Sequence, residues 1–160
     1  MKTDTATRVL DETDQKILEL LQEDGRMTNA AIGARVGLTP PSVYERVRKL
    51  EQRGVIRGYT AIIDPAALGK TLTAFIRLTT VDDESYEPGV EALRSDPDIL
   101  ELHHVAGEDC FLIKTKVEDT GALEALLKRI RGTVTVQRSV TMIAISSYKE
   151  NGAIIPPHDA

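Results

Sequence analysis

Positively charged side chains are concentrated in one short stretch of this sequence, residues 40–58. The cations of the stretch are Arg46, Arg48, Lys49, Arg53 and Arg57, and its acids are Glu45 and Glu51. This local excess of three positive charges contrasts with a formal net charge of -5 for all 160 residues. Guanidinium and ammonium groups donate hydrogen bonds to phosphates and to the acceptor edges of bases. An acidic chain that gathers its cations in this way indicates a local site for a polyanion.

The spacing of apolar residues around these cations predicts a helix that begins after Thr39. Pro40 suits the first helical position, where no amide hydrogen is needed, and Gly54 ends the helix. The buried side is formed by apolar residues at helical spacing, namely Val43, Val47 and Leu50. The opposite side carries Pro41, Glu45, Arg48 and Gln52, flanked by Ser42 and Lys49 on one edge and by Tyr44 on the other. The outward face of this helix is therefore polar and basic.

A second, shorter helix is predicted immediately before the basic one. It begins after Thr28, which can cap it, and runs to about Val36, with Gly37 supplying the left-handed residue that ends it. Two helices joined by a short glycine-containing turn form a helix-turn-helix, whose second helix enters the major groove of DNA. The alternative interpretation of the same pattern is an ordinary amphipathic helix with a solvated charged face.

The DNA-reading interpretation assigns roles to individual side chains. We expect base-edge contacts from Ser42, Tyr44, Glu45, Arg48 and Lys49, phosphate contacts from Arg46, Arg53 and Arg57, and a place in the interface for the capping residue Thr39. Arg48 has the geometry to bind the two acceptors of guanine, whereas Glu45 can accept from cytosine. Arg53 should contribute affinity with little sequence preference.

The order of motifs around this stretch resembles the Lrp/AsnC family of bacterial and archaeal transcription regulators, also called feast/famine regulatory proteins. LDETDQKILELLQEDGRMT precedes the helix pair, GVIRGYTAIIDPAALG follows it, and the likeness continues to about Lys149. The resemblance implies a DNA-binding head followed by an amino-acid sensor of ACT-like topology. It also implies effectors bound between dimers, near the loop that joins the second and third strands of the sensor.

Composition and charge fit a two-part cytoplasmic protein. The chain is 41% hydrophobic and 28% charged, as in ordinary globular domains. No run approaches eighteen apolar residues and the N-terminus lacks a signal peptide, so we expect a cytoplasmic protein with no membrane partner. Because the head is expected to bind DNA, we also expect the protein to be associated with the nucleoid. Residues 1–58 hold ten Lys/Arg against nine Asp/Glu, whereas residues 59–160 hold ten against sixteen. A nearly neutral head on an acidic body restricts contact with DNA to the head.

Periodicity divides the chain into four segments. We expect a helix-turn-helix domain at 1–58, which begins with a scaffold helix from Asp11 or Thr13 to Asp24. A strand at about 55–63 and a short PAALG turn then make a linker and hinge that occupies 59–70. The sensor domain follows at 71–149 and a flexible tail at 150–160.

The sensor domain reads as an α+β fold of ferredoxin-like β-α-β-β-α-β order. Its predicted strands are TLTAFIRLTTV, ILELHHVAG, CFLIKTKV and about 135–147, and its helices are about 84–95 and 120–131. Both helices of such a fold cover the same face of the sheet. Adjacent strand residues point to opposite faces of the sheet, and some adjacent pairs are both apolar, such as Phe75 with Ile76 and Leu112 with Ile113. This pattern indicates that the other face is covered by a second copy. We therefore expect a homodimer that assembles into tetramers or octamers.

The resemblance places the effector at the loop V-A-G-E-D-C-F, residues 105–111. Gly107 lets backbone approach a ligand, Glu108 or Asp109 can hold an ammonium group, and Ser139 and Thr141 match the paired hydroxyl positions of the family. Cys110 stands where the family often has an acidic residue, which leaves the identity of the ligand open. The competing interpretations are a plain hairpin turn and ordinary β-propensity of Ser and Thr.

Other chemistry finds little support in the sequence. His103 and His104 are adjacent on a predicted strand, so their side chains diverge and cannot bind one metal ion together. Cys110 is the only cysteine, which excludes an internal disulfide and a cysteine zinc site, and a buried thiol is favoured over a redox sensor. Without catalytic or nucleotide fingerprints, we expect no enzyme, cofactor or metal. Two other hypotheses stay open: a constitutive DNA-organising protein, and a metabolite-binding module without a DNA role.

Overall fold

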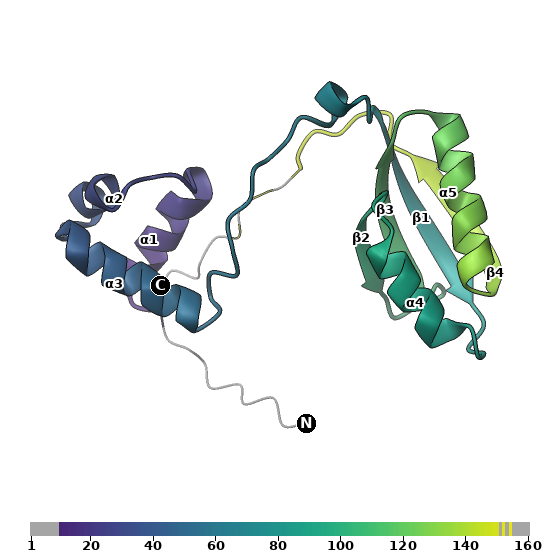
Figure 1. Cartoon of the computed structure of the whole chain (residues 1–160), viewed down its shortest axis with the longest axis horizontal. Coiled ribbons are helices and arrows are strands. Elements are labelled where there is room, and N and C mark those ends of the chain that lie inside the picture. The colour runs from purple at the N-terminus through teal and green to yellow at the C-terminus, as the bar shows by residue number, and fades with distance from the viewer. Residues whose placement is uncertain (1–9, 151, 153, 155–160) are drawn as a thin grey trace. The chain divides into compact units, whose positions relative to one another are not determined.

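The computed structural model describes residues 10–150, 152 and 154 (Figure 1). Within these residues the chain divides into two compact units. The first, which we call the head, comprises residues 10–61 together with the described residues from 149 onward, and the second, the body, comprises residues 62–148. Most of the predicted tail, 150–160, lies outside the described residues.

Three helices make up the head: α1 (Glu12–Glu23), α2 (Asn29–Val36) and α3 (Pro40–Gln52). Each begins after a side chain that accepts a hydrogen bond from a free amide of its first turn. Asp11 accepts from the Asp14 amide at 2.7 Å and Thr28 from the Ala31 amide at 3.2 Å. Thr39 caps α3 in the same manner. Local capping chemistry therefore sets all three helix starts; the sequence predicts Thr28 and Thr39 and leaves Asp11 and Thr13 as alternatives for α1, of which the structure selects Asp11.

The apolar sides of these helices meet in one core. Its fully buried members are Ile17, Leu20, Ile32, Val43 and Leu50. Burying an aliphatic side chain of this size contributes about 1.5 to 3 kcal/mol, so the stripe on α3 fixes how that helix lies. Val55 and Ile56, which follow α3, pack on the same core and thus belong to the head.

A close backbone approach sets the geometry between α2 and α3. Gly37 ends α2 with φ +71°, the left-handed conformation that glycine adopts readily. A Cβ on Gly33 would lie 2.4 Å from the Leu38 carbonyl oxygen, and the Leu38 amide donates to the Gly33 carbonyl at 3.0 Å. Only a glycine fits at position 33, a requirement that helical periodicity did not reveal.

The predicted strand at 55–63 is wrong for the single chain. These residues form neither a helix nor a strand, and the next element is a short 3-10 turn, η1 (Pro65–Leu68). A β-branched sequence favours an extended backbone, but a strand also needs a neighbour for its ladder of hydrogen bonds. Ile62 and Ile63 remain 76% and 57% exposed.

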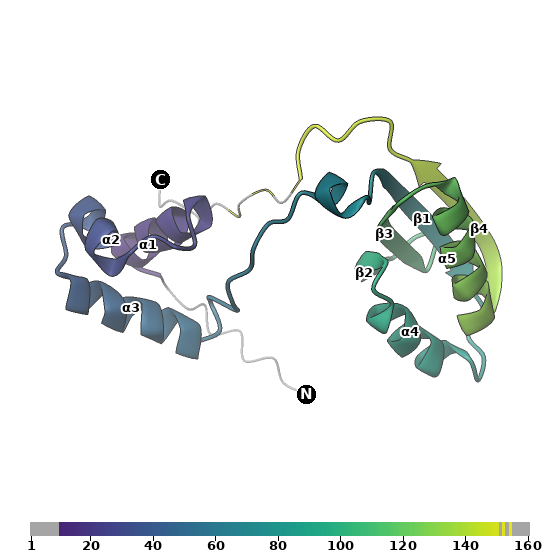
Figure 2. The same cartoon turned by 45° about the horizontal axis from the view of Figure 1, so that its top comes forward.

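The body has the predicted ferredoxin-like topology. Its elements are β1 (Leu72–Thr80), α4 (Tyr86–Ser95), β2 (Ile99–His104), β3 (Phe111–Val117), α5 (Thr120–Thr133) and β4 (Val136–Ile143). The strand order is β2-β3-β1-β4, with every neighbouring pair antiparallel. Figures 1 and 2 show α4 and α5 on the same side of the sheet. The main differences are at the ends, since α4 begins later and β4 stops earlier than expected.

The two faces of the sheet differ in composition. On the helix-covered face, β1 contributes three apolar side chains that are fully buried, those of Ala74, Ile76 and Leu78. Cross-strand partners share a face, so the open side carries Phe75 opposite Met142 and Arg77 opposite Val140. The open face therefore mixes apolar and charged groups, and does not form a second continuous apolar surface.

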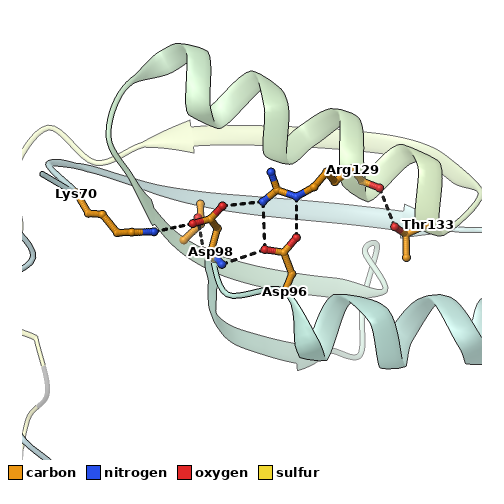
Figure 3. Close-up of polar contacts among 6 residues, drawn as sticks. Lys70, Asp96, Asp98, Arg129 and Thr133 are labelled. Carbon is orange, nitrogen blue, oxygen red and sulfur yellow. Dashed lines mark hydrogen bonds and ion pairs between the residues drawn. The ribbon is translucent and has the colours of Figure 1, made fainter. Parts of the chain in front are cut away.

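A cluster of ion pairs joins three segments of the body (Figure 3). The guanidinium of Arg129, on α5, donates to both oxygens of Asp96 at 2.9 and 3.1 Å and to Asp98 at 2.7 Å. Lys70, just before β1, donates to Asp98 at 2.6 Å. Hydrogen bonds from Arg129 to Asp96 and from Lys70 to Asp98 lower the pKa of both carboxyls. The cluster fastens α5 to the loop between α4 and β2.

Removing the central cation should destabilise the body in a pH-dependent way. We expect Arg129→Met to lower the free energy of unfolding at pH 7 by about 1 to 2 kcal/mol, allowing for solvent screening of a half-exposed guanidinium. Because the carboxyl pKa values are depressed in the fold, this contribution is present above about pH 4 and declines as pH falls through the lowered values. Urea unfolding at several pH values tests this, with Arg131→Met on the same helix as the control. A stability difference that stays constant down to pH 2.5 would contradict the assignment.

Candidate nucleic-acid interface and effector loop

The outward face of α3 presents the side chains that the sequence predicts. Five of them are exposed, namely Pro41, Ser42, Glu45, Arg48 and Lys49, and Tyr44 is 54% exposed. Val43 and Leu50 are buried on the opposite side, so the helix cannot turn this face inward without losing its core contacts. The polar face is thus a fixed feature of the head.

A shallow groove runs along α3. It is lined by Asp14, Pro41, Ser42, Glu45, Arg46, Lys49, Leu50, Gln52 and Arg53. Arg48 and Glu45 approach each other only to 4.0 Å, and both side chains are more than half exposed, so they are weakly held. Arg57 is exposed beyond the end of the helix. The groove brings together residues from both ends of α3, with three cations of that helix beside the acids Asp14 and Glu45.

Arg46 occupies a different position from the other cations. One of its terminal nitrogens donates to Asp11 and to Asp14, each at 2.7 Å, which joins α3 to the first turn of α1. This hydrogen bond is the main cause of a lowered pKa at Asp11. The sequence prediction assigned Arg46 to phosphate, whereas the structure gives its guanidinium two partners inside the head. The sequence signal that could have indicated this pairing is the presence of two acids, Asp11 and Asp14, three residues apart at the start of a helix.

The loop at 105–111 is closed by backbone hydrogen bonds. The Val105 amide donates to the Cys110 carbonyl at 2.9 Å, and the Cys110 amide donates to the Leu78 carbonyl at 2.8 Å. Gly107 has φ +140°, a conformation that other residues rarely adopt. Cys110 is half-buried and packs against the core of the body. These contacts make the loop an ordered hairpin connection.

The two acids of this loop differ sharply in environment. The Asp109 side chain is 9% exposed; Nε of Arg77 donates to one of its oxygens at 2.6 Å and Arg138 donates to the other at 3.0 Å. Glu108 is 83% exposed and lies 3.8 Å from Arg138. Asp109 therefore has its charge balanced by two guanidinium groups, which leaves Glu108 as the accessible carboxylate of the pair.

Ser139 and Thr141 do not lie with Asp109 in the single chain. Ser139 is paired with Leu78 and Thr141 with Ile76, so both hydroxyls are on the helix-covered side of the sheet. Asp109 is held instead by arginines of the open side. The structure thus brings Gly107, Glu108, Asp109 and Cys110 together but separates them from the two hydroxyl residues.

Other candidate chemistry is limited in the part of the chain that the structure describes. No group of three or more His, Cys, Asp or Glu side chains there is placed to hold a metal ion. His103 contacts Glu101 at 3.3 Å, whereas the ring of His104 packs against Phe111 with centroids 5.2 Å apart. Between residues 10 and 154, no described helix is long and apolar enough to cross a membrane.

Comparisons with known proteins identify both units. Residues 10–51 match the AsnC-type helix-turn-helix domain, and residues 73–154 match the Lrp/AsnC ligand binding domain. The chain belongs to the Lrp/AsnC family. As a member of this family of transcription regulators it is a DNA-binding protein with a ligand-binding body, and it is not an enzyme.

Relatives resemble this Lrp/AsnC protein along almost its whole length. The leucine-responsive regulatory protein of Escherichia coli K12 is 40% identical over 149 residues, covering 91% of both chains. LrpA of Mycobacterium tuberculosis is 36% identical over 141 residues, 88% of this chain and 94% of its own. A solved transcriptional regulator of Neisseria meningitidis, in complex with L-methionine, is 30% identical with a TM-score of 0.85, covering 93% of this chain and 97% of its own.

Substitutions at Arg48 and Arg46 should separate DNA contact from head stability. We expect Arg48→Ala to weaken binding to a duplex selected from random sequences by about 1 to 3 kcal/mol with unchanged thermal stability. Arg46→Ala should instead lower the stability of the head by about 1 to 3 kcal/mol, because Asp14 then loses its partner. Fluorescence anisotropy and thermal unfolding of both variants make the comparison. Equal affinity of Arg48→Ala and wild type for the selected duplex would refute the base-contact role.

Proposed function

We propose that this Lrp/AsnC protein reads a specific DNA sequence with the outward face of α3 and adjusts its binding in response to an amino acid. The proposal for DNA rests on the two opposite sides of α3. Val43 and Leu50 are buried on one side, whereas Tyr44, Glu45 and Arg48 are exposed on the other. A helix held in this way by its apolar side can lie along a groove with its polar side toward base edges.

The contacts divide into two classes. Arg48 binds guanine, Glu45 accepts from cytosine, and Ser42, Tyr44 and Lys49 complete the base-edge contacts, with Thr39 at the start of the helix. Arg53 and Arg57 bind phosphates and set affinity with little sequence preference. Arg46 contributes mainly by holding α3 on α1, through Asp11 and Asp14.

We infer that the open face of the body is covered by a second copy of the chain. Phe75, Val140 and Met142 on this face are not covered by either helix of the body, and the face also carries cations and acids that can pair across an interface. Such a dimer places two heads on one DNA molecule, and tetramers or octamers engage further half-sites. We place this assembly in the cytoplasm, on the nucleoid.

The effector in this proposal is an amino acid bound at the loop 107–110. Glu108 supplies an exposed carboxylate for the ammonium group, and the backbone around Gly107 can approach the ligand closely. Ser139 and Thr141, on the other side of the sheet, contribute only if the ligand lies between copies. The regulator of N. meningitidis solved with L-methionine supports this choice of ligand class.

A constitutive DNA-organising protein of the same fold is the second candidate. The specific observation in its favour is Asp109, whose carboxylate is already neutralised by Arg77 and Arg138. With Cys110 in place of an acid next to it, the loop has fewer free ligand groups than the family pattern implies. In this alternative the assembly binds DNA without responding to any amino acid.

One titration decides between the two candidates. We expect L-methionine or L-leucine to change the affinity of wild-type protein for a selected duplex by about 5- to 150-fold, the usual range of allosteric coupling. Glu108→Gln should abolish this response while leaving affinity without amino acid unchanged, because residue 108 lies outside the head. Glu124→Gln, an exposed change on α5, is the control. The absence of any response to the twenty amino acids in the wild type would leave the constitutive candidate.

A further inference from the structure

A residue near the C-terminus is hydrogen-bonded to the head. Nε2 of Gln22, in the last turn of α1 (Glu12–Glu23), donates to the Ile154 carbonyl at 2.8 Å. Oε1 of the same amide accepts from the Ile154 amide at 2.7 Å. One glutamine thus satisfies both backbone groups of a residue 132 positions away, as a neighbouring strand residue does in a sheet. Both hydrogen bonds are exposed and Ile154 is 80% exposed, so the contact is made through the backbone of this residue.

An apolar groove lies beside this contact. Its lining comes from α1, from Leu10 just before that helix and from the segment after α3, and includes Leu10, Leu18, Leu21, Val55, Ile56, Tyr59 and Ile154. The Tyr59 hydroxyl donates to Glu51 at 3.0 Å, which holds this wall of the groove against α3. The groove therefore joins α1 to the residues that follow α3, and the Ile154 backbone is fixed at one edge of it.

We propose that Ile154 is a structural part of its own chain's head, fastened by Gln22 beside the apolar groove. The clustering of the described residues from 149 onward with the head agrees with this arrangement. The head would then be joined to the body by two covalent connections, one at residues 61–62 and one at 148–149.

The second connection gives the body a further route to the head. It continues from β4, and β4 carries Arg138, which binds Asp109 in the loop at 105–111. A ligand that shifts this loop therefore acts on a strand whose chain continues to the Gln22 contact. This consequence rests on the proposed effector role of the loop, whereas the docking of the segment does not.

Cross-linking tests whether the segment docks on its own head. Full-length protein with Cys110→Ser receives Glu19→Cys, one turn from Gln22, together with Ile154→Cys, and is treated with a short bis-maleimide. We expect an intrachain cross-link, identified by mass spectrometry of peptides at monomer mass. Glu12→Cys with Ile154→Cys is the control, because Glu12 lies about 15 Å from Gln22 along the same helix. Yields equal to the control, or a cross-link between two chains, would overturn the proposal.

Hydrogen exchange measures the contribution of the contact without cysteines. Ile154→Pro removes the amide that donates to Gln22, whereas Ile154→Val keeps it. We expect amides of the last turn of α1 to exchange roughly 2- to 10-fold faster in the proline variant only, the range for one lost hydrogen bond. Gln22→Met should have a similar effect that is not additive with Ile154→Pro. Unchanged exchange in both single variants refutes the docking, whatever the protein's response to amino acids.

Discussion

The burial of one apolar stripe on α3 (Pro40–Gln52) governs what this protein can present to a partner. With Val43 and Leu50 fully buried, the helix has a single side left, and that side is polar and cationic. Gly33 is as necessary as the stripe, because the Leu38 carbonyl occupies the space where a Cβ would stand. The same constraint therefore sets the turn between α2 and α3 and the side chains that we propose contact DNA. Packing and recognition are two consequences of one arrangement.

The body uses its charges for a different purpose. Arg129 and Lys70 neutralise Asp96 and Asp98, and this cluster fastens α5 to the loop between α4 and β2 (Figure 3). Asp109 is neutralised likewise by Arg77 and Arg138 from two different strands. An acidic composition thus does not translate into free acidic sites, since half-exposed arginines of the body balance several carboxylates. At the same time, these pairs couple the loop at 105–111 mechanically to β1 and β4.

Features with local causes were predictable from the sequence. Helix starts followed from capping residues such as Thr28 and Thr39, and the order of strands and helices in the body followed from changes in periodicity. Features that depend on distant partners were not predictable. The pairing of Arg46 with Asp11 requires knowledge of how α3 lies on α1, and the Gln22–Ile154 contact joins residues 132 apart. The failed strand at 55–63 shows the same limit, because β-propensity cannot supply a neighbouring strand. Individual DNA and effector contacts remain predictions for this reason.

The most direct test of the central claim is photo-cross-linking to DNA from matched exposed positions. A benzophenone side chain replaces Tyr44 on α3 (54% exposed) or, in a second variant, Leu100 on β2 of the body (52% exposed). Each variant is irradiated on a duplex selected from random sequences. We expect position 44 to cross-link to bases within each half-site and position 100 to give no cross-link. Equal cross-linking from both positions, or from position 100 alone, would contradict the conclusion that α3 is the part of the molecule that reads DNA.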